Sequence, residues 1–268
     1  MTGGHVRIRG GAATGMKIRL GFGNPGYAFG TSEPAVQAFL AEWLRPGDVF
    51  YDVGANVGFF TLLAARLVEP EGRVYAFEPV PANVSALKEN VSLNALSNVQ
   101  IVEAAVAEET GTALLAVQGS LTSRLASDSE PLAADAIRVA VVSLDDAVQR
   151  RGFRSPRVVK IDAEGSELAV LRGMEWILRE HLPAVVCELH QEISRIDALR
   201  QVAAAVSEAT GTRFSIERSN GSSILVGSPL PYRVCLLEPD LDTDRRWVPH
   251  VVALPPTPPP RGAVQRRS

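Results

Sequence analysis

The chain has 268 residues, of which 46% are apolar and 21% are charged, as expected for an ordinary globular protein. A formal net charge of -3 argues against a broad nucleic-acid-binding face, because phosphate binding needs clustered Lys and Arg. No apolar run reaches the ~20 residues of a membrane span, and the first residues lack the apolar core of a secretory signal. Cys187 and Cys235 lie in apolar, strand-like segments and are expected to be reduced. We therefore expect a cytoplasmic protein with neither a nucleic-acid nor a membrane partner.

The N-terminal region contains local patterns that predict two short strands, a turn and the start of a helix. Two short strands are predicted within residues 5–20, so residues 1–30 are expected to form an N-terminal β extension. A first helix is predicted to begin near Ser32, whose hydroxyl is expected to cap it. Residues 21–26 match the glycine pattern G-x-G-x-x-G, but no helix is predicted to begin at Gly26, so we interpret this segment as a turn.

From residue 49 onward, apolar strands alternate with amphipathic helices. Strands are predicted at 49–53, 73–77, 99–102, 139–142, 158–161 and 184–189, with shorter ones at 214–216, 223–226 and 234–237. Helices are predicted at 59–67 and 167–178, around 84–91, and around 199–206. This alternation predicts a doubly wound α/β fold with a mostly parallel sheet covered on both faces.

Two segments depart from this alternation. Residues 108–136 show little periodicity, and we interpret them as a long excursion with one strand near 113–117. The Pro-rich, basic residues 255–268 cannot bury apolar area and are expected to be disordered. The main folded domain is therefore expected to cover residues 31–254.

The most informative segment is the run DVGANVG at residues 52–58, between a predicted strand and a predicted helix. Its glycines, Gly54 and Gly58, let the backbone approach a ligand closely beside the positive N-terminus of the helix. Glu78 ends the next predicted strand about twenty residues later, where an acid binds the ribose hydroxyls of an adenosine cofactor. Tight packing of strand against helix is the alternative explanation for the glycines alone.

The residues of this turn also discriminate between two nucleoside cofactors. Asp52 would face the pyrophosphate of a dinucleotide, which is electrostatically unfavourable, whereas it is a good partner for the amino group of a methionyl moiety. Asn56 occupies the position where a dinucleotide fingerprint has its second glycine. The pattern favours S-adenosylmethionine, with a nicotinamide-dependent oxidoreductase as the alternative.

Four strings in the chain carry a resemblance to a known family: VFYDVGANVGFFT, VYAFEPVPANVSALKENV, SLDDA and VVKIDAEGSELAVLRGM. Across residues 30–190 the chain resembles the FkbM-type methyltransferases, and KIDAEGSE is the most specific part. The resemblance implies a class I methyltransferase (Rossmann-like) fold, S-adenosylmethionine as cofactor, and O-methylation of a small-molecule or saccharide hydroxyl.

On matching positions, the resemblance also implies contacts with the cofactor. These are expected at Asp52, Gly54, Asn56, Gly58 and Glu78, with the neighbouring Ala55 and Pro79 in the same site. Glu33 matches a G-x-x-E element that precedes the first helix, and its role is less defined. Ala105 stands where many class I enzymes have an acid for the adenine amine, so backbone or neighbouring groups are expected to hold adenine there.

The chemical site is expected where the strand at 158–161 ends. Lys160 lies within a central apolar strand and is costly to bury unless it is paired, and Asp162, Glu164 and Glu167 follow closely. One interpretation is a structural ion network. The other is that Asp162 accepts the acceptor's proton while Lys160 and Glu164 orient and tune it, with Glu167 as a structural member.

Further acceptor contacts are expected around the next strand and the long excursion. Alternation places Glu188 and His190 on one face, opposite Cys187, so they suit a hydroxyl-rich acceptor, and His190 is an alternative base. Ser123 in the excursion is expected to face the acceptor. No metal is predicted. A module that binds S-adenosylmethionine without turnover remains a third possibility, and the sequence does not reveal the oligomeric state.

Overall fold

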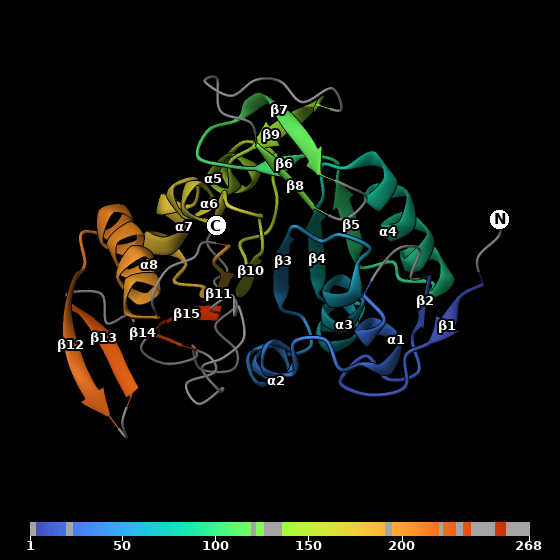
Figure 1. Ribbon diagram of the computed structural model, residues 1–268, viewed down its shortest axis with the longest axis horizontal. Helices are drawn as coiled ribbons and strands as arrows, with labels where there is room; N and C mark the ends of the chain where they lie inside the picture. Colours follow the sequence, from blue (N-terminus) through green and yellow to red (C-terminus); the bar gives the residue numbers. More distant parts are fainter. Residues whose placement is uncertain are drawn as a thin grey trace, which may run out of the picture.

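A nine-stranded sheet runs through the centre of the protein, in the order β12-β13-β14-β15-β11-β10-β3-β4-β5 (Figure 1). The computed structural model describes residues 4–19, 24–118, 122–125, 136–190, 195–219, 222–228, 233–236 and 250–255. The central strands are parallel: β3 Val49–Val53, β4 Arg73–Phe77, β5 Val99–Val102, β10 Val158–Ile161 and β11 Ala184–Glu188. All residues of β3 and β10 are buried, as their continuous apolar runs predict.

Antiparallel strands extend this sheet beyond β11. They are β12 Arg213–Ser219, β13 Ser222–Ser228, β14 Arg233–Leu236 and β15 His250–Leu254. The first three agree with the shorter strands predicted from the sequence. β15 is not predicted from the sequence, because its short apolar run adjoins a Pro-rich segment. β15 pairs directly with β11 and therefore separates the parallel strands from the other three.

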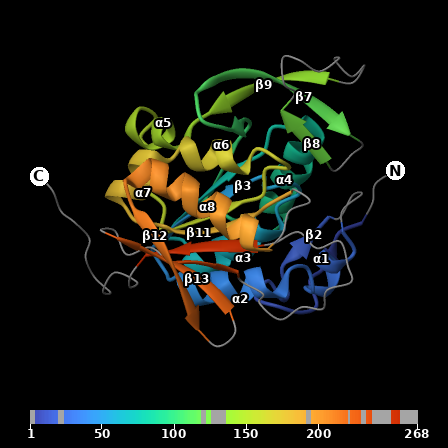
Figure 2. The same cartoon turned by 60° about the vertical axis from the view of Figure 1, so that its left-hand side comes forward.

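Helices cover both faces of the sheet (Figure 2). One face packs against α2 Pro34–Trp43, α3 Phe59–Val68 and α4 Pro81–Leu93. The other packs against α5 Leu144–Gln149, α6 Glu167–Arg172, α7 Glu175–Glu180 and α8 Arg195–Thr210. The predicted doubly wound α/β fold is confirmed. The chain turns outward in opposite directions from β3 and β10, so these neighbours form the switch point at which such folds place their ligands.

A second, smaller sheet occupies the region that the sequence analysis assigned to a long excursion. Its order is β6-β9-β7-β8, formed by β6 Ala105–Val106, β7 Gly111–Gln118, β8 Thr122–Leu125 and β9 Ala136–Val142. The strand predicted near 113–117 is confirmed as β7 and the one predicted at 139–142 as β9, whereas β8 is a second strand within 108–136 that the sequence does not predict. The edge-to-edge pairing of β7 with β9 stabilises these weakly patterned residues, and a local periodicity does not report such pairing.

The N-terminal strands form a hairpin, β1 Val6–Arg7 with β2 Lys17–Ile18, as predicted. Two local predictions are wrong. A one-turn helix, α1 Gly26–Phe29, does begin at Gly26, because the side chain of Asn24 accepts from the Gly26 N–H at 2.8 Å. Ser32 does not cap α2, because its hydroxyl accepts from the Asn24 amide at 3.0 Å, and Glu33 occupies the cap position.

The predicted helix over 167–178 is divided into α6 and α7 at Gly173. A Cβ at Gly173 would lie 2.2 Å from the carbonyl oxygen of Ala107, so the chain needs glycine for this close approach. The carboxylate of Asp145 then accepts from the backbone N–H groups that begin α7, those of Trp176 and Ile177. Across the described residues, each helix is too short or too polar to span a bilayer.

Candidate active site

The turn after β3 is built from left-handed backbone. Gly54, Asn56 and Gly58 have φ angles of 75°, 51° and 95°. The N–H groups of Gly54 and Ala55 both donate to the carbonyl of Phe77 at the end of β4, at 3.1 and 3.0 Å. A Cβ on Gly54 would lie 1.8 Å from the backbone oxygen of Asp162, so only glycine permits β3 and β10 to end this close together.

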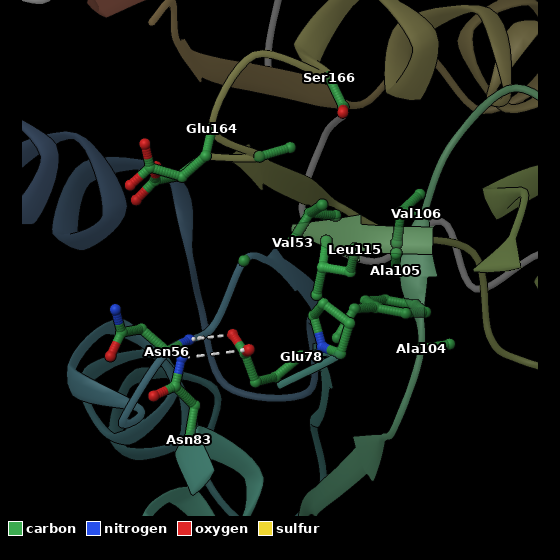
Figure 3. A pocket seen from close by; sticks show the side chains of 15 residues that line it. Val53, Asn56, Glu78, Asn83, Ala104, Ala105, Val106, Leu115, Glu164 and Ser166 are labelled. Carbon is green, nitrogen blue, oxygen red and sulfur yellow. Dashed lines mark hydrogen bonds between the residues drawn. The ribbon is translucent and has the colours of Figure 1, made fainter. Parts of the chain in front are cut away.

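Glu78 connects this turn to the end of β4. Its Oε2 accepts from the Asn56 N–H at 2.8 Å and its Oε1 from the Asn83 amide at 3.2 Å (Figure 3). Oε1 also accepts from the Val80 N–H at 2.9 Å. Burial raises the pKa of the Glu78 carboxyl, and these donors act in the opposite direction. Asn83 is not predicted from the sequence, because its position within α4 carries no signal of its own.

A cavity beside Glu78 opens to solvent, and the space in and in front of it measures about 600 Å³. It is lined by Val53, Gly54, Asn56, Phe77, Glu78, Pro79, Asn83, Ala104, Ala105, Val106, Leu115, Asp162, Ala163, Glu164 and Ser166. Most of these follow the carboxyl ends of β3, β4 and β10, and the small sheet closes one side with apolar groups. Figure 3 shows Glu164 across the opening from Glu78, with Ala105 and Leu115 on the apolar side. Carboxylates and apolar groups thus face one cavity, a combination typical of small-molecule sites.

Several residues predicted to contact the cofactor line this cavity, and others do not. Asp52 lies behind it, 1% exposed, where its Oδ2 accepts from the Thr61 hydroxyl at 2.5 Å. Its Oδ1 has no hydrogen-bond partner among the described residues. Burial raises the pKa of Asp52, and the charge of Lys160 on the neighbouring strand opposes this. Ala55 and Gly58 shape the turn without lining the cavity.

Lys160 is buried on the same sheet face as Asp52, since the two are register partners on β10 and β3. Its Nζ donates to Oδ2 of Asp162 at 2.8 Å and lies 4.9 Å from the ring centroid of Phe60. Burial alone would lower the pKa of Lys160, but the surrounding carboxylates of Asp162, Glu33 and Asp52 raise it. The surrounding carboxylates therefore stabilise the positive charge of Lys160.

His190 follows β11 and meets the segment after β10. Its Nδ1 lies 2.8 Å from Oε1 of Glu167, while its Nε2 lies 3.6 Å from Oδ1 of Asp162, 3.6 Å from Oε2 of Glu164 and 3.9 Å from Oε1 of Glu188. Burial lowers the pKa of His190, but the Glu167 hydrogen bond and the neighbouring carboxylates outweigh it and raise the value to about 9. The sequence predicts roles for these residues separately but does not predict the bond between His190 and Glu167.

One oxygen each of Asp162 and Glu188 and one ring nitrogen of His190 lie within 4.8 Å of one another, close enough for a cation to bridge them. Lys160 already supplies one positive charge to this group. That no metal binds stays a prediction.

Two residues predicted to contact a ligand, Glu33 and Ser123, are not found at the cavity wall among the described residues. Glu33 stands at the start of α2 with a φ of 43°, near enough to Lys160 to influence its charge, and it does not line the cavity. Ser123 belongs to β8 rather than to a loop, and its side chain lies outside the described residues, as does the tail 256–268. Cys187 is a buried free thiol, as predicted, and the Cys235 side chain is not among those described.

The chain is similar in sequence to known methyltransferases. A family profile, the Methyltransferase FkbM domain, matches residues 52–213. The 31-O-demethyl-FK506 methyltransferase FkbM of Streptomyces tacrolimicus is 32% identical over 176 residues, 55% of this chain and 67% of that protein. The hexuronic acid methyltransferase AglP of Haloferax volcanii is 27% identical over 185 residues, 65% of this chain and 69% of that protein. A crystal structure of the methyltransferase FkbM from Methylobacillus flagellatus KT aligns at a TM-score of 0.48 and 17% identity, over 86% of this chain and 55% of that one.

Proposed function

The chain belongs to the FkbM methyltransferase family, and from this premise we propose that it transfers a methyl group from S-adenosylmethionine to a hydroxyl oxygen of a small molecule or saccharide. The relatives compared above are named as a 31-O-demethyl-FK506 methyltransferase, which indicates an oxygen acceptor, and as a hexuronic acid methyltransferase. These names support the acceptor class, and the chemistry of the cavity supports the cofactor.

The observation that carries the proposal is the charge of the cavity wall. Glu78, Asp162 and Glu164 line it, and no Lys or Arg is found among the described lining residues. Such a wall repels the pyrophosphate of a nicotinamide dinucleotide and attracts a sulfonium cation. The geometry therefore favours a methyl donor over the oxidoreductase alternative.

The residues present fit the cofactor. Glu78 uses only one lone pair of Oε2 for the Asn56 N–H, which leaves another to accept from a ribose hydroxyl. Asp52 does not line the cavity, so the predicted contact of its unpartnered Oδ1 with an ammonium group requires the turn to move when the cofactor binds. Ala105, Val106 and Leu115 provide an apolar surface for the adenine ring. Gly54 and Asn56 in the turn after β3, together with Pro79 after β4, complete the site.

When bound, S-adenosylmethionine supplies a methyl carbon that its sulfonium charge has already activated. The protein's own task is to hold the acceptor oxygen in line and to deal with its proton. We assign Asp162 the contact with the acceptor hydroxyl, since it lines the cavity at the switch point. Lys160 fixes one carboxylate oxygen of Asp162 at 2.8 Å, and Glu164 borders the same opening. Glu188 and Ser123 are proposed as further contacts with the acceptor.

The test is transfer of a labelled methyl group from S-adenosylmethionine to hexuronic acids, neutral sugars and a macrolide polyol, each paired with an amine analogue. We expect label on hydroxyl acceptors, and a loss of about 100-fold in Asp162→Asn with cofactor binding retained, because the acceptor oxygen is no longer held in position. Asp197→Asn, which makes the same change at an exposed position of α8, should behave as wild type.

Other outcomes point to the alternatives. Label on amines alone would contradict the hydroxyl acceptor. Cofactor binding without transfer to any acceptor would favour a module that binds S-adenosylmethionine without turnover.

A further inference from the structure

The bond between Glu167 and His190 joins two elements at the edge of the candidate active site. Oε1 of Glu167 lies 2.8 Å from Nδ1 of His190 and also accepts from the Gly165 N–H at 2.8 Å. The Glu167 side chain is 1% exposed and that of His190 is 20% exposed. Because burial and the Gly165 bond hold the carboxylate, the imidazole ring cannot rotate without breaking a buried hydrogen bond.

The other ring nitrogen points toward the cavity wall. Nε2 lies 3.6 Å from the nearest oxygens of Asp162 and Glu164, and both of these residues line the cavity. This distance is longer than a normal hydrogen bond, so neither carboxylate holds Nε2 as tightly as Glu167 holds Nδ1. A hydroxyl bound at Asp162 would therefore lie within reach of Nε2.

Asp162 is a poorer final holder of a proton than His190. Its Oδ2 is the closest hydrogen-bonding partner of the Lys160 ammonium, which is only 2% exposed. A proton on Asp162 would cancel the largest of the negative charges that stabilise this buried cation, to which Glu33 and Asp52 also contribute. His190 does not stabilise a buried cation in this way. The negative charge of Glu167 would stabilise its protonated ring, as in the carboxylate–histidine pairs of hydrolases.

We propose that His190 is the catalytic base of the methyl transfer and that Glu167 is the positioning residue that keeps its Nε2 free to accept a proton, an inference that rests on the proposed function. The hydroxyl proton moves to Nε2 as the acceptor oxygen forms its bond to the methyl carbon. The electron pair of the broken carbon–sulfur bond stays on sulfur. Asp162 orients the hydroxyl during this step.

The arrangement requires one tautomer of neutral His190, with the proton on Nδ1 donated to Glu167. The charged groups facing the ring are Glu167 from α6, Asp162 and Glu164 from the segment after β10, and Glu188 from β11. Together they raise the pKa of His190 to about 9, so the base becomes available in alkaline solution.

The test is nitrogen-15 NMR of the ligand-free protein with labelled histidine, which gives the tautomer and titration of each of the four histidines. His190→Gln identifies the signal. We expect the Nδ1–H tautomer above a midpoint near pH 9. In Glu167→Gln the midpoint should fall by about one pH unit or more, whereas Glu103→Gln, an exposed carboxylate paired with Lys88, should leave it unchanged.

The proposal would be overturned if His190 carried its proton on Nε2 in the neutral form, or if its titration midpoint were unchanged in Glu167→Gln. Selective broadening of the Nε2 signal by stoichiometric Mn²⁺ would also overturn it, because Nε2 would then be a metal ligand. The wild-type tautomer decides the matter even if Glu167→Gln does not fold. Since this measurement needs no cofactor, its failure is distinguishable from failure of the methyltransferase assignment. On an acceptor that the transfer assay yields, the rise of kcat/KM with pH should shift to lower pH in Glu167→Gln.

Discussion

The ion network around His190 predicts a specific pH dependence of stability. The pKa of His190 rises from 6.5 to about 9 on folding. Because the folded value is the higher one, the stabilisation is complete below pH 6.5 and is lost as the pH rises through 9. With about 1.4 kcal/mol for each pKa unit, the group contributes about 3 kcal/mol at low pH.

His190→Gln removes the titrating group while keeping a side chain that can bond to Glu167. The difference in unfolding free energy between wild type and variant should therefore be larger by about 3 kcal/mol at pH 5.5 than at pH 10. Urea denaturation followed by tryptophan fluorescence measures both values, with the slope against urea checked for constancy. A difference that stays the same at both pH values would refute the claim that folding raises the pKa of His190.

Three further predictions concern the frame of the site. Gly54→Ala should lower the unfolding free energy by at least about 3 kcal/mol in the urea assay, because the added Cβ meets a backbone oxygen. The control Gly152→Ala, at a similar φ of 72° but facing open space, should lower it by about 1 to 2 kcal/mol. Asn90→Ala should cost about 2 kcal/mol by thermal denaturation, because the buried amide donates to the Val57 carbonyl at 2.8 Å; a shift of Tm within error would contradict this. Cys187 should resist thiol reagents at pH 8 in the folded protein and react in urea, because burial raises the pKa of its thiol; rapid native labelling by mass spectrometry would disprove it.

Local patterns in the sequence predicted the frame of the molecule. The runs that became β3, β4, β10 and β11 are apolar and short, and each is followed by a helix or a turn with its own signal. Gly54 and Glu78 could be predicted as site residues because both belong to one strand–helix–strand unit. The spacing between them is therefore visible in a short stretch of sequence.

What the sequence could not predict depends on contacts between distant segments. The bond of Glu167 to His190 joins residues 23 positions apart and requires β10 and β11 to pair in register. The small sheet forms because β6 and β7 both pair with β9, and its wall residue Leu115 has no local signal. The break at Gly173 arises from packing against a loop that precedes it by more than sixty residues.

The central claim is that the cavity beside Glu78 binds S-adenosylmethionine, and calorimetric titration of the purified protein tests it most directly. S-adenosylmethionine, S-adenosylhomocysteine and NADH are titrated into wild type, Glu78→Ala and the control Glu103→Gln, with circular dichroism to confirm folding. We predict micromolar binding of both adenosyl ligands, weakened about tenfold or more only in Glu78→Ala, and no binding of NADH. Binding of NADH, or of none of the three, would contradict this assignment and the mechanism built on it.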